Sequence, residues 1–525
     1  MYKIKWKITF EKHAPVEGYA DVAGEVWHLA PLLPEDRIVS AEAVMALELA
    51  DDERIFINGY QTWTSCPEYT KRSRQRGVGP YPRVIRDHYG MDRYGDYHFI
   101  DYPKKRGVLQ GESWCYFRRG ENFRLIASLN ERPGYTLFRV DANAGTLTVR
   151  RDCAGVKCCG TYHVFDLFFA EGSEDAVFDA WFAEMRIAPR TLRRLAGYSS
   201  WYNRYQDISA ESIRADLEGC SSVLRRGDLF QIDDGWEPFV GDWLETDAKK
   251  FPDGLKPLAG SIHDSGFLAG LWLAPFVCQK DSAIMREHPD WLLMHNGKPW
   301  YCGCNWGGFY ALDIDNPEFE AYLEKTFDRV LNDWGFDLVK LDFLYAAAPY
   351  GDERESRAGR MTRALELLRR LCGDKLILGC GVPVMPAFGL VDYCRISCDV
   401  GLDWNNNFIV RNANRETVST YRAILNSIFR RQLNGRAYLS DPDVFFLRED
   451  NIKLTPEQKY KLATVNSLFG GMLLCSDNMG QYTGEARALY AQLLKNRDAK
   501  NIRVSTGSGL TVSYDTGGTE EILTI

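Results

Sequence analysis

Acidic and aromatic side chains recur at one kind of position in the second half of this sequence, at or just after the ends of short apolar runs. These residues are Trp201, Asp233, Asp234, Trp272, Asp342, Asp399, Asp441, Asp443 and Asp477. A mouth with many carboxylates and few basic groups disfavours phosphate or carboxylate substrates, because like charges repel. Carboxylate acceptors and flat aromatic faces together suit a neutral, hydroxylated ring. The pattern therefore indicates a site for a sugar.

Two of these carboxylates stand in contexts that favour chemistry over a structural role. Asp342 lies between Leu341 and Phe343 in a strongly apolar run, where an unpaired charge is costly. Asp399 has a similar setting, with Arg395 four residues earlier. Two carboxylates at one mouth are the equipment for glycoside hydrolysis. One attacks the anomeric carbon, while the other protonates the leaving oxygen and then activates water.

The two carboxyls need different pKa values at the working pH. Lys340 shares a strand face with Asp342 by period-two alternation, so we expect it to keep Asp342 ionised as a nucleophile. Asp399 needs a drier or more anionic setting to hold its proton. For any one of the remaining carboxylates taken alone, a helix cap or a turn is the better explanation, and Asp443 and Asp477 are candidates for that structural role.

These residues need a frame that brings strand ends together, and the sequence from about residue 195 supplies one. We expect eight strands, at residues 195–203, 228–236, 267–276, 336–345, 375–383, 393–400, 436–441 and 470–476. Helical patterns lie at 210–226, 255–265, 317–334, 355–372, 416–434, 456–467 and 484–495. Eight such units in roughly 300 residues predict a (β/α)8 TIM barrel, whose reactive groups come from the carboxyl ends of the strands.

The segments before and after the barrel have a different pattern. Residues 1–185 contain short β runs separated by Gly, Asn, Asp and Pro turns, which predicts an N-terminal β-sandwich domain. A helical stretch at 174–186 leads into the catalytic (β/α)8 barrel, residues 186–498. Residues 499–525 predict a short C-terminal β tail that is too short for an independent domain. The expected fold class is multidomain, with a β-sandwich, a TIM barrel and a short β segment.

Composition and charge exclude several classes of protein. The 525 residues are 45% hydrophobic and 26% charged, as in folded globular proteins. The formal net charge of −8 repels phosphate backbones and anionic lipids, so we expect no nucleic acid and no membrane as partners. The start lacks the apolar core of a signal peptide. Most of the 14 cysteines stand singly in apolar runs without metal-ligand spacing, so we expect reduced thiols, no metal and a cytoplasmic location.

Six motifs in order resemble those of glycoside hydrolase family 36, the α-galactosidases and their relatives. They are Gly197-Tyr-Ser-Ser-Trp201-Tyr, Ile232-Asp-Asp-Gly-Trp236, Gly270-Leu-Trp272-Leu-Ala-Pro275, Val339-Lys340-Leu-Asp342-Phe, Gly379-Cys380-Gly-Val-Pro383 and Arg395-Ile-Ser-Cys-Asp399. The upstream segment Asn58-Gly-Tyr-Gln-Thr-Trp63 is similar to a loop that reaches over the barrel from the N-terminal domain of that family. The resemblance therefore covers most of the chain.

The resemblance implies a retaining, exo-acting α-galactosidase that forms a covalent glycosyl-enzyme. It implies Asp342 as the nucleophile and Asp399 as the acid/base, with Asp233 and Asp234 at the 4- and 6-hydroxyls of the sugar. The other implied substrate-binding residues are Lys340, Cys380 and Arg395 near the 2- and 3-hydroxyls, and Trp63, Trp201 and Trp272 at the walls. It implies no metal and no organic cofactor. The expected partner is an α-galactoside or related oligosaccharide, and the expected assembly is a monomer or small homo-oligomer.

Two departures from the family pattern leave alternatives open. The C-terminal domain is reduced to a short tail, and the stretch after Asp399, Gly401-Leu-Asp403-Trp404-Asn-Asn-Asn, is polar enough to recognise an aglycone or a substituent on the sugar. An α-N-acetylgalactosaminidase and a galactosyl-transferring relative are the nearest alternatives. A sugar-binding protein without catalysis is the alternative from another class, and the presence of both Asp342 and Asp399 argues against it.

Overall fold

Two antiparallel sheets form the first part of the chain in this computed structural model, which describes residues 2–507 and 509–525. The strands are β1 (Tyr2–Phe10), β2 (Val16–Val22), β3 (Val26–Leu29), β4 (Leu32–Ala46), β5 (Arg54–Ile57), β6 (Val108–Glu112), β7 (Trp114–Arg119), β8 (Asn122–Ser128), β9 (Tyr135–Asp141), β10 (Thr146–Asp152), β11 (Lys157–Thr161) and β12 (Phe165–Ser173). One sheet has the order β2-β1-β4-β10-β9-β6, with β11 on β4, and the other has the order β3-β12-β8-β7-β5.

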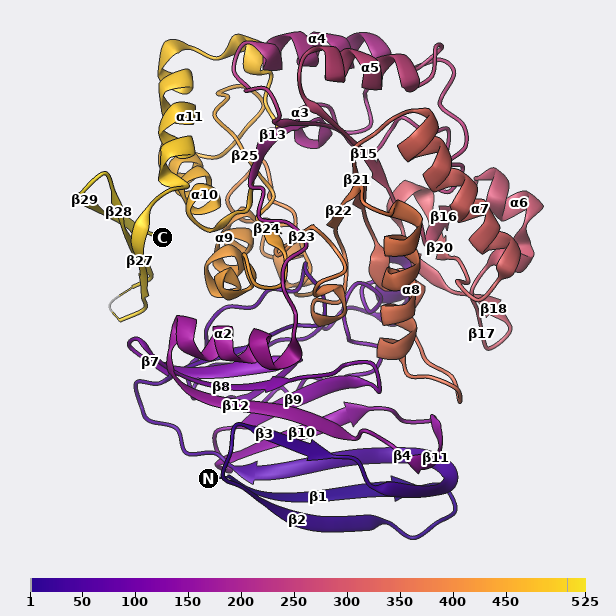
Figure 1. The fold of residues 1–525 in the computed structure, drawn as a ribbon, viewed down its shortest axis with the longest axis vertical. Coiled ribbons are helices and arrows are strands. Elements are labelled where there is room, and N and C mark those ends of the chain that lie inside the picture. The colour runs from indigo at the N-terminus through magenta and orange to yellow at the C-terminus, as the bar shows by residue number, and fades with distance from the viewer. Residues whose placement is uncertain (1, 508) are drawn as a thin grey trace.

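The two sheets share one apolar core. Along β10 the side chains of Leu147 and Val149 are buried and alternate with more exposed polar residues, as expected for a sheet with one face on a core. The shared cluster takes Phe138 from one sheet and Phe117 and Ile126 from the other. Figure 1 shows the sheets stacked below the rest of the molecule, in the indigo and purple part of the ribbon.

A curled parallel sheet follows, and all eight expected strands are confirmed in it. They are β13 (Leu195–Ser199), β14 (Leu229–Ile232), β15 (Leu268–Leu273), β21 (Leu338–Leu341), β22 (Leu376–Gly379), β23 (Tyr393–Arg395), β24 (Leu439–Asp441) and β26 (Met472–Cys475), with the short β25 (Val444–Phe445) beside β26. The order is β24-β23-β22-β21-β15-β14-β13-β26-β25. The backbone N–H of Gly471 donates to the Ser440 carbonyl at 2.8 Å, which connects the two ends of the sheet as a barrel requires.

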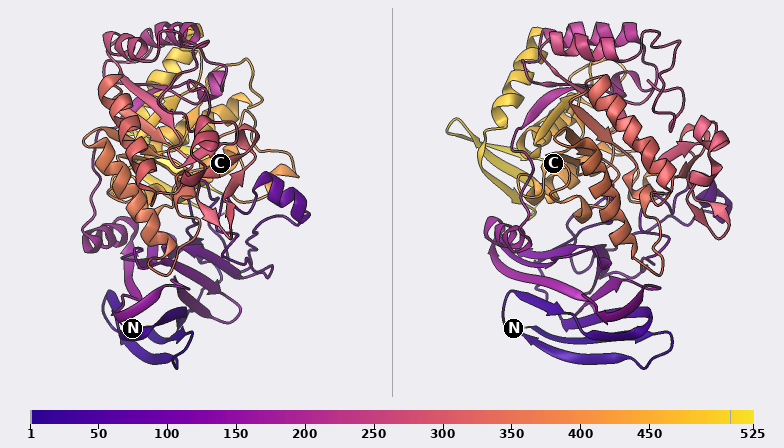
Figure 2. Two further views of the ribbon diagram at one scale, coloured as in Figure 1. Left: turned by 90° about the vertical axis from the view of Figure 1, so that its right-hand side faces the viewer. Right: turned by 45° about the vertical axis from the view of Figure 1, so that its right-hand side comes forward.

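Helices cover the outer side of this sheet (Figures 1 and 2). The main ones are α4 (Ala210–Ser221), α5 (Lys256–Asp264), α7 (Pro317–Asp328), α8 (Arg357–Cys372), α9 (Thr420–Phe429), α10 (Pro456–Phe469) and α11 (Gly484–Asn496). Five begin after Ser or Thr caps whose oxygens accept backbone N–H bonds, as at Ser209 and Thr455. The expected helix at 416–434 is shorter because Ser419 caps α9. The expected helix at 317–334 continues beyond α7 as a π-helical turn, Arg329–Asp333.

Three further parts complete the chain. Helix α2 (Glu174–Met185) joins the antiparallel sheets to β13, and β27 (Lys500–Ser505), β28 (Thr511–Thr516) and β29 (Thr519–Thr524) form a small terminal sheet. Between β15 and α7 lies an insertion that the sequence did not predict as a sheet, with β16 (Val277–Gln279), β19 (Tyr301–Gly303) and β20 (Phe309–Ala311). Among the described residues, no helix is both long and apolar enough to span a membrane.

Candidate active site

The carboxyl ends of the parallel strands open into a cavity of about 490 Å³. Eight of the expected site residues line it, namely Trp63, Trp201, Asp233, Asp234, Trp272, Lys340, Asp342 and Asp399. Cys380 and Arg395 are buried behind this lining. The Trp63 ring N–H donates to the Cys380 sulfur at 3.4 Å, and an Arg395 guanidinium nitrogen lies 2.8 Å from Asp399. Both residues therefore belong to the site through a neighbour that lines the cavity.

Asp342 is fixed at the end of β21 by two hydrogen bonds. The Trp272 ring N–H donates to Oδ2 at 3.1 Å, and the backbone N–H of Phe343 donates to Oδ1 at 2.9 Å. Phe343 adopts a left-handed backbone conformation with φ of 54°, a strained state that proteins maintain mainly at functional sites. The turn after the strand therefore holds this carboxylate still while leaving it on the cavity wall.

Asp399 faces a single guanidinium that is shared among three carboxylates. Arg395 lies 2.8 Å from Asp399, 3.0 Å from Asp441 and 3.0 Å from Asp443. Burial raises the pKa of Asp399 to about 6; Arg395 acts against this rise and the Asp443 carboxylate adds to it. Such a carboxyl can donate and take back a proton near neutral pH. Asp443 therefore does more than cap a turn, because it shapes the charge around Asp399.

We expected Lys340 to pair with Asp342, but its close contact in the structure is with a different carboxylate. Lys340 Nζ lies 2.9 Å from Asp233 Oδ2, which also accepts a 2.8 Å bond from the side-chain amide of Gln231. Although burial disfavours the charged ammonium, Asp233 raises the pKa of Lys340 above its usual value. Strand alternation did put Lys340 on the inner face, but the side chain reaches across β15 to the end of β14.

Asp234 is held by residues that the sequence analysis missed. Its Oδ2 accepts bonds from the Trp306 ring N–H at 2.9 Å and from the Gln206 amide at 2.8 Å. Behind it, the buried Glu237 carboxyl contacts the Asp234 carboxyl and accepts a 3.3 Å bond from the Gly235 N–H. Burial, and then the Asp234 charge, raise the pKa of Glu237 well above its usual value. We therefore predict that Glu237 is the protonated partner of the pair and donates to Asp234.

The long segment between β5 and β6 covers one side of the cavity and supplies Trp63 and Tyr94. It is anchored by Arg430, which is completely buried. This guanidinium donates to Asn58 Oδ1 at 3.0 Å and to the carbonyl oxygens of Thr62 and Ile396 at 2.7 and 2.9 Å. Arg430 also donates to the Cys66 sulfur at 3.2 Å, so this buried cation joins the segment that carries Trp63 to the barrel through neutral acceptors.

Two irregular segments provide the remaining lining. Trp306 and Asn305 come from the insertion between β15 and α7, and Asn406, Asn414 and Glu416 come from the long loop after β23, with Val410, Thr417 and Val418. Neither segment follows the strand-helix pattern, so periodicity gave no indication of these side chains. The available signals were the length of these loops, because long loops in compact domains are commonly functional, and, for Asn406, the polar stretch after Asp399.

Comparisons with known proteins agree with this geometry. A family model described as Melibiase matches residues 196–364. The α-galactosidase of Escherichia coli is 34% identical over 199 residues, which are 36% of this chain and 26% of that protein. The matched stretch thus spans about a quarter of this curated relative.

Solved structures extend the similarity to the whole chain. TtGalA, an α-galactosidase from Thermus thermophilus in complex with p-nitrophenyl α-D-galactopyranoside, has a TM-score of 0.76 at 25% identity and covers 98% of both chains. The same enzyme in complex with stachyose has a TM-score of 0.72 at 26% identity, covering 89% of this chain and 99% of that one. GH36 α-galactosidase AgaA from Geobacillus stearothermophilus shares the fold, with a TM-score of 0.58 at 14% identity over 95% of this chain and 72% of that one.

In its fold the chain is similar to these barrel glycoside hydrolases. The expected resemblance to glycoside hydrolase family 36 is confirmed by these comparisons.

Proposed function

We propose that the chain is a retaining, exo-acting α-galactosidase that removes terminal α-linked galactose from small galactosides. The observation that carries this proposal is the pairing of Asp342 and Asp399 on one cavity in different settings. Asp342 accepts two hydrogen bonds at a fixed position, whereas Asp399 has a pKa of about 6. This difference is what a nucleophile and an acid/base require.

The reaction has two steps. In the first, an Asp342 oxygen bonds to the anomeric carbon, the glycosidic bond breaks, and the Asp399 proton passes to the leaving oxygen. In the second, the Asp399 carboxylate takes a proton from water, the water oxygen bonds to the anomeric carbon, and Asp342 is released. Two displacements at the same carbon return the original anomeric configuration.

The sugar is bound by the acidic end of the cavity and its aromatic walls. Asp233 and Asp234 accept hydrogen bonds from the 4- and 6-hydroxyls, and Lys340 lies against Asp233. Trp63, Trp201 and Trp272 form the walls, as the family resemblance implied. In this proposal Cys380 and Arg395 act through Trp63 and Asp399, the lining residues that they contact.

The leaving group occupies a second cavity of about 840 Å³ that adjoins the first at Trp201 and Asp399. Asp403 and Asn406, from the polar stretch after Asp399, line it, as does Lys453. The hydrogen-bonding groups of these lining residues suit a hydroxylated aglycone, such as the rest of an oligosaccharide. The T. thermophilus relative in complex with stachyose supports this substrate class.

The proposal includes the expected organisation of the chain. Residues 1–185 form an N-terminal β-sandwich, residues 186–498 the catalytic (β/α)8 barrel, and residues 499–525 a short β tail. The expected cytoplasmic location and the monomeric or small homo-oligomeric assembly remain part of the proposal. Size-exclusion chromatography with light scattering measures the assembly directly.

The direct test is hydrolysis of a panel of nitrophenyl glycosides. We expect release from the α-galactoside and no release from the α-glucoside, the β-galactoside or the α-N-acetylgalactosaminide. Asp342→Asn should lower turnover by at least ~10⁴-fold, because the nucleophile is lost. Asp337→Asn, at the opposite end of β21, is the matched control and should retain activity. Preference for the N-acetylgalactosaminide would overturn the assignment to galactose, and retained activity of Asp342→Asn would overturn the mechanism.

A further inference from the structure

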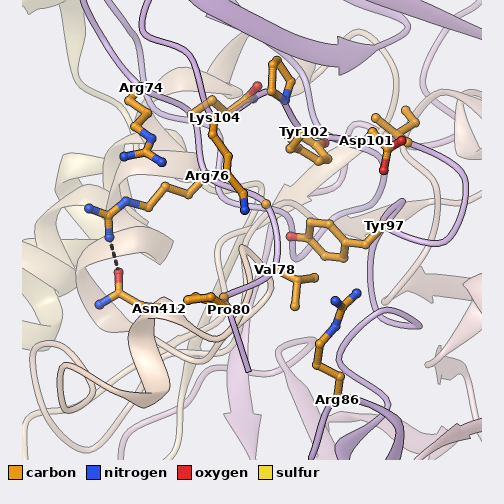
Figure 3. Close-up of a pocket in the computed structure, with 15 residues that line it drawn as sticks. Arg74, Arg76, Val78, Pro80, Arg86, Tyr97, Asp101, Tyr102, Lys104 and Asn412 are labelled. Atoms are coloured by element: carbon orange, nitrogen blue, oxygen red, sulfur yellow. Dashed lines mark hydrogen bonds between the residues drawn. The ribbon is translucent and has the colours of Figure 1, made fainter. Parts of the chain in front are cut away.

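A separate cavity of about 500 Å³ lies outside the barrel mouth, between the long segment after β5 and the loop after β23 (Figure 3). Its walls are partly apolar, with Val78, Pro80 and the rings of Tyr97 and Tyr102. None of the residues lining this cavity also lines the sugar pocket. It is therefore a different site from the one described above.

The charge in this cavity is opposite to that of the whole chain. One carboxylate, Asp101, lines the cavity together with four cations, which are Arg74, Arg76, Arg86 and Lys104. Asp92 neutralises Arg86 through contacts of 2.7 and 2.8 Å. Within residues 2–507 and 509–525, no carboxylate lies at ion-pair distance from the other three cations, and Arg76 donates only to the amide oxygen of Asn412, at 3.0 Å.

Grouped cations without counter-charges repel one another, and a concave wall concentrates their field. The chain has a net charge of −8, so this accumulation is not an average property of its surface. Two guanidinium groups and an ammonium around one hollow match the several oxygens of a phosphate group, which accepts paired hydrogen bonds from arginine. The cavity is several times larger than a phosphate ion, and its tyrosine and proline walls leave room for an attached ring.

The tyrosine wall is held in place. Tyr97 donates to Glu416 Oε2 at 2.7 Å and accepts a 2.8 Å bond from the Arg415 backbone N–H. Tyr102 donates to Asp96 at 2.6 Å. A rigid aromatic wall costs little conformational entropy when a ligand binds against it.

We propose that this cavity binds a small phosphate monoester of a sugar-sized molecule. The guanidinium groups of Arg74 and Arg76 and the Lys104 ammonium bind the phosphate oxygens, and the organic part lies against Tyr97 and Tyr102. The bound ester contacts the loop after β23, which carries Asn412 in this cavity and lining residues of the sugar pocket a few positions further on. The proposal does not depend on which sugar the barrel hydrolyses.

The test is calorimetric titration of the full chain with glucose 6-phosphate, with glucose as the neutral comparison. We expect saturable binding of the ester that weakens as sodium chloride is raised, and competition by inorganic phosphate. Arg74→Gln with Arg76→Gln should weaken binding at least ~10-fold, because two charge-assisted hydrogen-bonding groups are lost. The matched control is Arg83→Gln with Lys105→Gln, which removes two exposed cations outside the lining and should leave binding unchanged.

Several results would overturn the proposal. The first is a flat titration with both the ester and inorganic phosphate. The second is binding that survives Arg74→Gln with Arg76→Gln, or that falls equally in the control variant. The third is equal binding of glucose 6-sulfate, which carries a single charge and so would contradict a site for a dianion. Unchanged circular dichroism and nitrophenyl galactoside hydrolysis in the variants show that the fold is intact.

Discussion

The Arg395 guanidinium lies 2.8 Å from the Asp399 carboxylate, although Asp399 is the residue that must hold a proton in the proposed reaction. An arginine so close favours the ionised carboxylate. Burial opposes this effect, and Asp443, on the same guanidinium at 3.0 Å, adds a second negative charge. The balance leaves the pKa of Asp399 at about 6, so the proton is available in mildly acidic and near-neutral solution.

The pH dependence of hydrolysis should follow this group. The first step needs protonated Asp399, and the protonated fraction falls tenfold per pH unit above its pKa. We therefore expect kcat/KM for an α-galactosyl disaccharide to decline above about pH 6. Initial rates between pH 4 and pH 9 measure this decline. A value of kcat/KM that stays constant up to pH 8 would contradict the assignment of Asp399 as the acid.

Asp443→Asn should move that decline to lower pH. The substitution removes a negative charge that raises the pKa of Asp399, and it frees Arg395 to favour the ionised form. Tyr202→Phe is the matched control, because it removes the 2.6 Å bond to Asp443 without changing a charge. A decline that stays in place in Asp443→Asn, or that moves to higher pH, would show that Asp443 does not act on Asp399.

Glu237 should matter as a hydrogen-bond donor to Asp234 and not as a charge. Glu237→Gln keeps a donor of the same length, so KM should stay within about 3-fold of the unsubstituted enzyme. Glu237→Leu leaves Asp234 without that donor in a buried position, and we expect KM to rise at least ~10-fold. Michaelis-Menten kinetics of both variants make the comparison. Equal damage by the two substitutions would show a role in packing alone.

Trp306 should contribute to substrate binding through Asp234. Trp306→Phe keeps an aromatic ring but removes the N–H that donates to Asp234 at 2.9 Å, so KM should rise about 10-fold with a smaller change in kcat. The control is Trp404→Phe, because the half-buried Trp404 ring lies outside the sugar pocket and outside the cavity for the leaving group. If both substitutions change KM equally, Trp306 has no specific part in the site.

Much of the barrel and of the candidate site followed from the sequence. Apolar runs separated by helical patterns placed the eight parallel strands, and the rule that reactive groups follow such strands led to Asp342 and Asp399. Local patterns were sufficient for Asp342 because it directly follows β21, whereas Asp399 lies four residues beyond the end of β23. The turn at Phe343 and the cap at Ser419 are also local features, but the expected strand at 336–345 and the expected helix at 416–434 ran through them.

Contacts between distant segments were beyond sequence reasoning. Lys340 was placed on the correct face, but its partner Asp233 is on a strand that is not its neighbour. Trp306 reaches Asp234 from an irregular insertion, and Arg430 fastens a loop from the N-terminal part below Trp63. No periodic pattern specifies how far a loop reaches or which buried charge it meets.

The most direct test of the account is to identify the residue that becomes glycosylated. The protein is incubated with 5-fluoro-α-galactosyl fluoride, in which the ring fluorine slows the second step, and is then analysed by intact mass and peptide mapping. We predict one fluorogalactosyl group per chain, attached to Asp342, and none in Asp342→Asn. Attachment to any other residue, or hydrolysis of galactosides with inversion at the anomeric carbon, would contradict the proposed mechanism.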